Sequence, residues 1–332
     1  MRSEKPPRVP TGLNSPLRQA QAGKTEELSV AKSWLEFAKM QALGNDFVVV
    51  SESDLERAGA GGLYSQSADD RLAEIARALC NRHFGIGADG LIVVRDPDRQ
   101  DCQLGWIYVN SDGSPSAMCG NGLRCVALWA VERGIVNKES FKIATEIGPV
   151  AIAFQDRDQI TVDLGEPVLD SVSIPVAGPP RKRVLRESVV VEGMTLAITC
   201  VSMGNPHCVV FNAHVDPEEY LHLAPLIQSL DIFPEGINVE FALTDSADHA
   251  KVFVWERGCG PTLACASGAA AVLVAGVLEG ALARRARIEL PGGMLNLDWS
   301  EADQHVRLTG PAREIYRGTV DLAYVLSEAK ER

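Results

Sequence analysis

The chain repeats two short motifs in the same order, and this repetition limits the available folds more than any other feature. Residues 43–45 (LGN) return as residues 203–205 (MGN), at an offset of 160 residues. Residues 117–122 (AMCGNG) return as residues 263–268 (LACASG), at an offset of 146 residues. An apolar, alanine-rich segment with helical character follows each cysteine loop. Two echoes in the same order predict two similar halves, each presenting one cysteine.

The length and the charge balance define the class of protein. The chain has 332 residues, with 32 Lys and Arg against 44 Asp and Glu, for a formal net charge of −12. At about 150 residues per domain, this length favours two domains with separate cores. An acidic chain without a Lys/Arg run repels phosphate backbones, so we expect no nucleic-acid partner. The most apolar stretch, residues 263–278, is shorter than the ~20 residues that span a bilayer, so we expect a buried helix and no membrane partner.

The first residues and the cysteines bear on the location of the protein. Residues 1–33 hold four prolines and six Lys or Arg without apolar periodicity, which predicts a disordered tail. The tail lacks the apolar core of a secretory signal, and targeting to an organelle stays open. The eight cysteines include no CxxC pair. Cys80 and His83 have a metal-like spacing without a second pair, so we expect free thiols, no metal and a cytoplasmic protein.

Short apolar runs and helical patterns are mixed along the chain. Runs rich in Val, Ile and aromatic residues predict strands at residues 47–50, 91–94, 106–109, 208–211 and 252–255. Ser67 and Asp70 form a capping box before an i, i+3, i+4, i+7 apolar stripe over residues 72–79. Residues 123–131 and the segment after Cys265 predict two more apolar helices. Because the elements lack a steady βαβ rhythm, the expected fold class is α+β.

Residues 85–90 (GIGADG) match the dinucleotide-binding fingerprint letter for letter. That motif needs a strand before it and a helix N-terminus after it, which receives the pyrophosphate. Here a predicted helix precedes the motif and a predicted strand follows it. We therefore expect a tight glycine turn and no nucleotide cofactor.

The two cysteine loops carry the strongest chemical signal. Each leads directly into a predicted helix, so Cys119 and Cys265 lie near helix N-termini, where backbone N–H groups favour an anion. Such a position can lower a thiol pKa from ~8.5 to ~7 or below. Two thiols that face each other could remove a proton from carbon on one side and deliver one on the other. The alternatives are buried small hydrophobes, a redox dithiol, or a cysteine hydrolase that uses His207.

Another constellation suits an amino-acid ligand. Glu256 and Arg257 follow the strand predicted at residues 252–255, and together they complement an ammonium and a carboxylate. A surface ion pair is the plain alternative for such a dipeptide. Four asparagines also have turn-like surroundings, and each by itself is typical of a turn. They are Asn45, Asn110, Asn205 and Asn238.

Several separated motifs resemble the diaminopimelate epimerase family, from about Phe37 to Leu322. They are residues 43–47 (LGNDF), 82–90 (RHFGIGADG), 110–113 (NSDG), 118–122 (MCGNG), 203–207 (MGNPH), 256–258 (ERG), 264–265 (AC) and 309–312 (TGPA). The resemblance implies two pseudo-symmetric domains, each a mixed sheet wrapped around a central helix, with the active site in the cleft between them. We expect one half at residues 34–163 with 312–326, and the other at residues 164–311.

The resemblance also implies roles for individual residues. By position, Cys119 and Cys265 are the base and acid pair, while the backbone N–H groups at Gly120-Asn121 and Ala266-Ser267 hold the reacting carboxylate. His207 and Glu256 tune the pKa values of the thiols. The residues expected to contact the substrate, mostly at its unreactive end, are Asn45, Asn110, Asn205, Asn238, Glu256 and Arg257. The resemblance implies a homodimer whose domains close on the substrate. It also implies that the enzyme uses no pyridoxal phosphate, no other cofactor and no metal.

The expected function is therefore the interconversion of LL- and meso-2,6-diaminopimelate by two-base proton transfer, in lysine and peptidoglycan precursor synthesis. The alternatives are a racemase of another amino acid with the same two cysteines, or a thiol redox protein. Three residues depart from the family pattern. Ala42 and Ala266 stand where glycine is usual, and Pro261 stands where glutamate is frequent. Ala266 bears most on function, because a methyl there would crowd the carboxylate or oppose a left-handed backbone.

Overall fold

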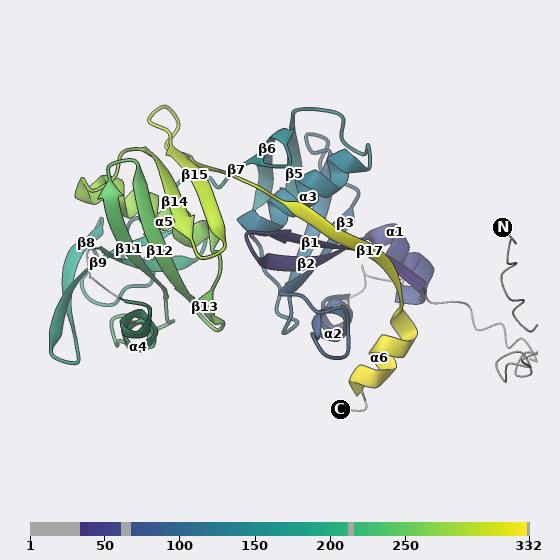
Figure 1. Ribbon diagram of the computed structural model, residues 1–332, viewed down its shortest axis with the longest axis horizontal. Helices are drawn as coiled ribbons and strands as arrows, with labels where there is room; N and C mark the ends of the chain where they lie inside the picture. The colour runs from purple at the N-terminus through teal and green to yellow at the C-terminus, as the bar shows by residue number, and fades with distance from the viewer. Residues whose placement is uncertain (1–33, 61–67, 212–215, 331–332) are drawn as a thin grey trace, which may run out of the picture. The chain divides into compact units, whose positions relative to one another are not determined.

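The computed structural model describes residues 34–60, 68–211 and 216–330. The predicted tail and the capping residue Ser67 lie outside these ranges. The described strands join into one 17-stranded sheet, in which β7 pairs with β16. This sheet wraps around two central helices, α3 and α5, in an α+β fold of two pseudo-symmetric domains. Figure 1 shows each of these helices among its own group of strands.

The first group of elements surrounds α3. It comprises β1 (Trp34–Ala42), β2 (Asn45–Ser51), α1 (Glu52–Leu55), the π-helical turn η2 (Glu56–Ala60), α2 (Ala68–Cys80), β3 (Gly90–Arg95), β4 (Leu104–Asn110), α3 (Gly120–Glu132), β5 (Ser140–Thr145), β6 (Gly148–Asp156) and β7 (Gln159–Asp163). The strand pairs β2–β3 and β4–β5 are parallel, whereas β1–β2, β3–β4, β5–β6 and β6–β7 are antiparallel.

The second group comprises β8 (Val184–Val191), β9 (Met194–Ser202), β10 (Pro206–Phe211), α4 (Pro217–Gln228), β11 (Asn238–Ser246), β12 (His249–Glu256), β13 (Gly260–Thr262), α5 (Ala266–Glu279), β14 (Arg285–Leu290), β15 (Gly293–Trp299) and β16 (Val306–Gly310). The parallel pair β10–β11 corresponds to β2–β3 of the first group. The chain then returns to the first group, because β17 (Arg313–Asp321) pairs with β1 before α6 (Leu322–Lys330) ends the described chain.

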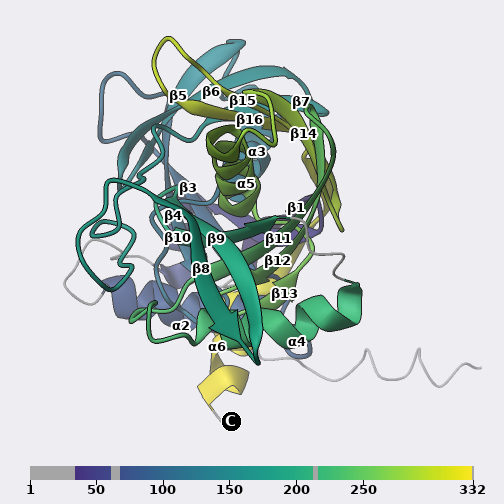
Figure 2. The same ribbon diagram turned by 90° about the vertical axis from the view of Figure 1, so that its left-hand side faces the viewer.

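Strands buried on both faces create the layers of the fold. In β2, Phe47 and Val49 pack with α3, whereas Val48 and Val50 pack on the opposite face with α2. The same division holds on the other side, where α5 packs on the inner face of its strands and α4 on the outer face. Figure 2 shows α5 enclosed by strands and α4 outside them. Double burial explains why these strands read as continuous apolar runs rather than as alternating ones.

All the strands and helices that the sequence predicts are present. The predicted strands correspond to β2, β3, β4, β10 and β12, and the predicted helices to α2, α3 and α5. The apolar stretch at residues 263–278 contains α5 from Ala266 onward, and the residues from Ala269 to Ala275 have no exposed surface. None of the helices in the described ranges combines the length and the apolar character that a bilayer crossing demands. The other strands were not predicted, and in several of them, such as β6 and β8, buried residues partly alternate with exposed ones.

The burial of α5 allows a test of the fold. Leu273 of α5 has no exposed surface, so Leu273→Ala should lower the free energy of unfolding by about 2–5 kcal/mol, through lost burial and a residual cavity. The control is Leu221→Ala in α4, where the leucine is 45% exposed and the loss should be within about 0.5 kcal/mol. Guanidinium unfolding at 25 °C measures both. Equal losses for the two variants would mean that α5 is not the core of its domain.

Candidate active site

Both predicted cysteines cap the N-terminus of a central helix. Cys119 is the N-cap of α3 and Cys265 is the N-cap of α5. Each sulfur accepts a hydrogen bond from the backbone N–H three residues further on, at Gly122 or Gly268, over 3.4 Å in both cases. The first N–H groups of a helix have no partner within the helix. The two helix ends therefore offer a thiol and backbone donors in matching geometry, as the repeated loops predict.

The two helix ends contact each other directly. The Asn121 side chain at the start of α3 donates through Nδ2 to the backbone oxygen of Ala264, next to Cys265, over 3.1 Å. A Cβ added to Gly120 would lie only 2.8 Å from the Cβ of Ala266. These contacts join residues 143 and 146 positions apart in the sequence. The structure thus brings both thiol loops into one site.

A charged network behind the site orients Asn45. The Asn45 amide donates through Nδ2 to Asp89 over 2.8 Å, and its Oδ1 accepts hydrogen bonds from Asn121 Nδ2 at 3.1 Å and from the Cys119 thiol at 3.9 Å. Arg82 binds both Asp46 and Asp89 at 2.8 Å, which fixes the Asp89 carboxylate. The residues from Arg82 to Asp89 thus support the first thiol loop. They lie between α2 and β3, as expected for a turn rather than a nucleotide site.

A second polar group surrounds Cys265. Glu256, the last residue of β12, accepts a hydrogen bond from Thr262 over 2.6 Å. The Cys265 sulfur lies 3.4 Å from the Ser267 hydroxyl. His207 Nε2 lies 2.9 Å from Asn205 Oδ1, and its Nδ1 lies 2.6 Å from Glu240 Oε1. His207 and Glu240 have no exposed surface.

Glu240 is a site residue that the sequence analysis missed. Its Oε1 would lie only 2.7 Å from a Cβ added to Gly268, so this carboxylate packs directly against the turn that Cys265 caps. The other carboxylate oxygen, Oε2, is buried and has no hydrogen-bond partner among the described residues. Burying a carboxylate that has a hydrogen-bond partner at only one oxygen costs free energy of folding. This cost indicates that Glu240 has a role at the site.

Burial dominates the acidity of the thiols. It raises the pKa of Cys119 to about 11, although the N–H groups of Gly122 and Asn121 act in the opposite direction. Burial also raises the pKa of Cys265 well above its ordinary value, and the negative charges of Glu256 and Glu240 add to this effect. The N–H groups of the helix ends lower the pKa of each thiol, as the sequence suggests, but the net shift is upward. Desolvation of the thiolate outweighs the hydrogen bonds of the helix ends.

Arg124 is another residue that the sequence analysis missed. It follows Cys119 by five residues in α3, and its side chain has no exposed surface. The guanidinium donates to Asn121 Oδ1 at 2.8 Å, to Pro311 O at 3.2 Å and to Gly120 O at 3.3 Å. None of these oxygens carries a full charge. Arg124 thus holds a buried positive charge beside the first thiol loop and fixes the amide of Asn121.

The remaining predicted residues have mainly supporting contacts. Both ends of the Asn238 amide bind backbone groups. Its Oδ1 accepts a hydrogen bond from Arg257 N at 2.9 Å, and its Nδ2 donates one to Pro206 O at 2.7 Å. Arg257 is exposed and donates to the Glu235 carbonyl at 2.8 Å. Asn110 bonds to Ser114 of its own loop at 3.0 Å. Of the four asparagines, Asn205 alone lies in a bend, whereas the other three begin or end strands.

The departure at Ala266 does not strain the backbone. Ala266 is the first residue of α5 and has a right-handed helical conformation, so the expected conflict with a left-handed backbone is absent. Its methyl group points at Gly120 in the facing helix, where no side chain opposes it. Ala42 is fully buried at the end of β1. Pro261 of β13 pairs with Trp255 of the neighbouring strand β12.

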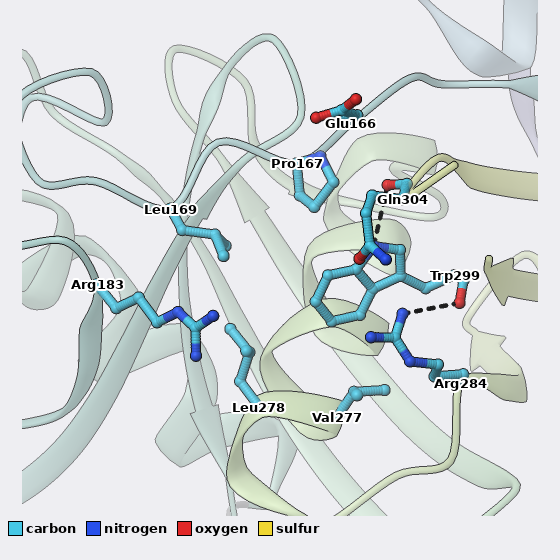
Figure 3. A pocket seen from close by; sticks show the side chains of 9 residues that line it. All are labelled: Glu166, Pro167, Leu169, Arg183, Val277, Leu278, Arg284, Trp299 and Gln304. Atoms are coloured by element: carbon cyan, nitrogen blue, oxygen red, sulfur yellow. Dashed lines mark hydrogen bonds between the residues drawn. The ribbon is translucent and has the colours of Figure 1, made fainter. Parts of the chain in front are cut away.

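A cavity of about 500 Å³ lies elsewhere, at the C-terminal end of α5. Figure 3 shows it between Leu169, Leu278 and Trp299, with the Arg183 and Arg284 guanidinium groups directed toward it. Because α5 rises about 1.5 Å per residue, this end is roughly 20 Å from Cys265. None of the predicted site residues lines this cavity.

The fold is shared with solved structures of distant sequence. A hydroxyproline epimerase from Agrobacterium vitis superposes with a TM-score of 0.64 at 14% identity, covering 87% of this chain and 91% of that one. A phenazine biosynthesis protein of the PhzF family from Bacillus anthracis gives a TM-score of 0.59 at 14% identity, covering 86% and 99%. At this level of identity, the likeness defines the architecture alone.

Closer relatives define the family. The sequence model of the family described as diaminopimelate epimerase matches residues 37–169 and 199–315. The chain is 40% identical over 312 residues to a chloroplastic diaminopimelate epimerase of Oryza sativa subsp. japonica, covering 91% of this chain and 84% of the relative. It is 41% identical over 287 residues to a diaminopimelate epimerase of Desulforudis audaxviator, covering 86% and 98%. The chain belongs to the diaminopimelate epimerase family, as the sequence motifs indicated.

The contact between Gly120 and Ala266 can be tested by a double-mutant cycle. Gly120→Ala should lower the free energy of unfolding by about 1–3 kcal/mol, because its Cβ would lie 2.8 Å from that of Ala266. Adding Ala266→Gly removes the opposing methyl and should recover most of this loss. Urea unfolding of the four proteins gives the coupling free energy, expected at about 0.5–3 kcal/mol. Strictly additive effects would mean that the two helix ends do not touch in solution.

Proposed function

We propose that this protein is a cofactor-independent epimerase that interconverts LL- and meso-2,6-diaminopimelate, in the synthesis of lysine and peptidoglycan precursors. The observation that carries the proposal is the meeting of two capped helix ends, each with a cysteine, in a member of this family. The chain also covers most of the relatives that are named for this activity.

The proposed reaction is a proton transfer with inversion at the α-carbon. The thiolate of one cysteine takes the α-proton, and the thiol of the other delivers a proton to the opposite face. Backbone N–H groups of Gly120-Asn121 and Ala266-Ser267 receive the α-carboxylate, whose negative charge grows as the carbanion forms. The buried surroundings strengthen these hydrogen bonds, because little water competes for the donors.

The other end of the substrate would be held by polar side chains that do not react. Arg257 complements a carboxylate and Glu256 an ammonium, while Asn45, Asn110, Asn205 and Asn238 supply amide groups. Asn238 contributes by fixing the backbone of Arg257 through its 2.9 Å hydrogen bond. Glu256 would also tune the thiols, since its negative charge raises the pKa of both Cys265 and Cys119. His207 would act on the thiols through Glu240 and Glu256.

We propose the same organisation that the sequence suggests. The two halves comprise residues 34–163 with 312–326 and residues 164–311, and they close on the substrate. The proposed location is the cytoplasm, where the eight cysteines, all in the described part of the chain, stay free thiols as in the structure. A homodimer is proposed because β17 exposes large apolar side chains, including Ile315 at 55% and Tyr316 at 46%.

Exchange of the α-proton with solvent tests the proposed reaction. In D₂O, under reducing conditions, NMR should show loss of the α-proton signal of diaminopimelate and none for ordinary L-amino acids. Cys119→Ser and Cys265→Ser should each lower the epimerisation rate by at least 10³-fold, since a hydroxyl is a far weaker acid than a thiol and supplies almost no anion to act as the base. Both variants should keep the circular dichroism of the wild type.

Cys259→Ser is the matched control for these substitutions, because Cys259 is exposed and is not among the proposed catalytic residues. It should keep near wild-type turnover. Wild-type turnover in either of the other two variants would overturn the two-thiol reaction. Exchange on another amino acid in place of diaminopimelate would point to a different racemase, and reversible disulfide cycling with a reductant would point to a redox protein.

The oligomeric state is measured by sedimentation equilibrium at micromolar concentration. The chain has a mass of 35.7 kDa, and the proposed dimer should have twice that mass. Ile315→Ser should weaken dimerisation, because it removes exposed apolar area from β17. A wild-type protein that stays monomeric throughout would contradict the proposed dimer and leave the proton transfer untouched.

A further inference from the structure

The glycine-rich segment at residues 85–90 (GIGADG) resembles a phosphate-binding motif, but its backbone N–H groups bind another part of the chain. Ile86 N and Gly87 N donate to the Leu79 carbonyl over 2.8 and 3.0 Å. Leu79 lies in the last turn of α2, where the carbonyl groups have no partner within the helix. The segment therefore caps the C-terminus of α2, and these N–H groups are not available to an anion.

The backbone of this segment is fixed close to α2. Gly87 has a φ of +81°, in the left-handed region that favours glycine. A Cβ on Gly85 would lie only 2.2 Å from the Ala78 carbonyl oxygen of α2, so the close approach requires glycine. The Lys39 ammonium donates a hydrogen bond to the Gly87 carbonyl. These contacts hold the position of Asp89, which comes directly before β3.

Asp89 binds the loop that carries Asn45. The Asp89 backbone N–H donates to Asp46 Oδ1 over 3.0 Å, and the Asp46 N–H donates to Asp89 Oδ2 over 3.0 Å, so the two loops hold each other reciprocally. Arg82 donates to Asp89 Oδ1 over 2.8 Å. Asp89 Oδ2 also accepts a hydrogen bond from Asn45 Nδ2 over 2.8 Å. Both carboxylate oxygens of Asp89 are therefore bound, and Asn45 is the residue through which Asp89 reaches the active site.

This hydrogen bond determines which way the Asn45 amide faces. A carboxylate can only accept hydrogen bonds, so the NH₂ group of Asn45 must face Asp89. The Asn45 oxygen then faces Asn121, whose Nδ2 donates to it over 3.1 Å. An NH₂ group can donate two hydrogen bonds, and among the described residues Asn45 Nδ2 has Asp89 as its acceptor. One N–H of Asn45 is thus left for a ligand.

Arg124 requires the same orientation from the opposite end. A guanidinium can only donate, so the oxygen of Asn121 must face Arg124, at 2.8 Å. The Asn121 NH₂ group then faces Asn45 and, across the site, the Ala264 carbonyl, each at 3.1 Å. The directions of the two amides are therefore fixed consistently by an anion at one end and a cation at the other.

The four residues Asp89, Asn45, Asn121 and Arg124 form one hydrogen-bonded chain, the amide chain. Both amides direct their NH₂ group toward the negative end and their oxygen toward the positive end, so the hydrogen bonds polarise one another. A reversed Asn45 would place its oxygen against the Asp89 carboxylate and its NH₂ group against the Asn121 NH₂ group. The reversed amide would lose both hydrogen bonds.

The second half of the molecule has no charges at the two equivalent positions. β10 and β11 pair in the same parallel register as β2 and β3, which makes Ile237 the equivalent of Asp89. The offset of 146 residues that relates the two cysteines also relates Arg124 to Ala270. Ile237 and Ala270 are both buried and apolar. The strand pair and the central helix therefore form without these charges, so the backbone fold does not require a carboxylate at position 89.

We infer that Asp89 is a positioning residue of the active site, which orients the Asn45 amide so that its remaining N–H is available to the substrate. The inference rests on the proposed function, in which Asn45 helps to hold the unreactive end of the substrate. A substrate carboxylate is a suitable acceptor for that N–H. Asp89 acts on the substrate only through Asn45.

The orientation of the amide can be tested without substrate. The protein is labelled with ¹⁵N at its asparagine side chains and observed by NMR, and Asn45→Ala assigns the NH₂ signals of Asn45. The N–H bound to the carboxylate should lie downfield and exchange slowly with water, unlike the other N–H, because a charged acceptor strengthens the hydrogen bond. Asp89→Ala should remove this difference.

Equal exchange of the two Asn45 protons with water in the folded wild type would overturn the inference. This measurement needs no variant at position 89, so it decides the orientation even where Asp89→Ala fails to fold.

A double-mutant cycle tests whether Asp89 acts through Asn45. With diaminopimelate as substrate, Asp89→Ala should raise KM by about 10-fold or more, because the substrate loses an oriented donor. In the Asn45→Ala background the same substitution should change KM by less than about threefold, since the amide that it orients is absent. A merely structural role would lower the amount of folded enzyme, which lowers the apparent kcat and leaves KM unchanged. Equal increases of KM in the two backgrounds would overturn the inference.

Two further variants serve as controls. Asp89→Asn keeps an oxygen that can accept from Asn45 Nδ2 and Asp46 N, which share one carboxylate oxygen in the wild type, so its KM should stay within about threefold of the wild-type value. A loss as large as in Asp89→Ala would overturn the role of this acceptor. The Asp46 side chain binds Lys39 and Arg82 of the same network, so Asp46→Ala should have the same effect on KM with and without Asn45→Ala.

Failure of the inference and failure of the proposed function give different results. A protein without α-proton exchange on diaminopimelate would refute the proposed function, and the NMR signals of the free protein would still decide the orientation of Asn45. An active enzyme whose Asn45 protons exchange equally would refute the role of Asp89 alone.

Discussion

The contact between the N-termini of the two central helices is the constraint on which the site depends. Gly120 and Ala266 can touch because one of them has no side chain, and Asn121 spans the contact by bonding to Ala264. This close approach buries Cys265, partly buries Cys119 and gathers backbone donors from two helices around one point. It also removes water from the sulfurs, so burial raises the pKa values of Cys119 and Cys265 together. The same contact therefore creates the donors and weakens the thiols as acids.

The helices can meet in this way because the strands enclose them. In α5, the residues between Ala269 and Ala275 are small or branched apolar side chains with no exposed surface, which lets the sheet approach from all sides. The outer helices α2 and α4 then cover the second face of the central strands. A helix buried on every side cannot shift to suit a ligand. The position of each cysteine is thus fixed by the core of its domain.

The sequence predicts the parts of the fold that carry a strong local signal. The strands buried on both faces are recognisable by their continuous apolar runs, α2 by its apolar stripe, and α3 and α5 by their mostly apolar sequences. Arg124 and Glu240 were missed because each lies within an apolar segment, where a single charge is ordinarily directed to solvent. Their burial depends on distant partners, such as Pro311 for Arg124. The net upward shift of the thiol pKa values was not predicted for the same reason, since desolvation depends on packing that the motifs do not contain.

The repeat that organises the fold has kept its backbone geometry, whereas side chains near the two thiols have diverged. Each half still presents a cysteine at the N-terminus of a central helix. The equivalent pairs of this chain differ in charge at Arg124 and Ala270, at Ile92 and Glu240, and at Asn110 and Glu256. These changes leave the helix caps and the strand register in place, because each occurs at a side chain and none at a turn. Symmetry of the backbone therefore positions the two thiols, while the buried charges around them differ between the two halves.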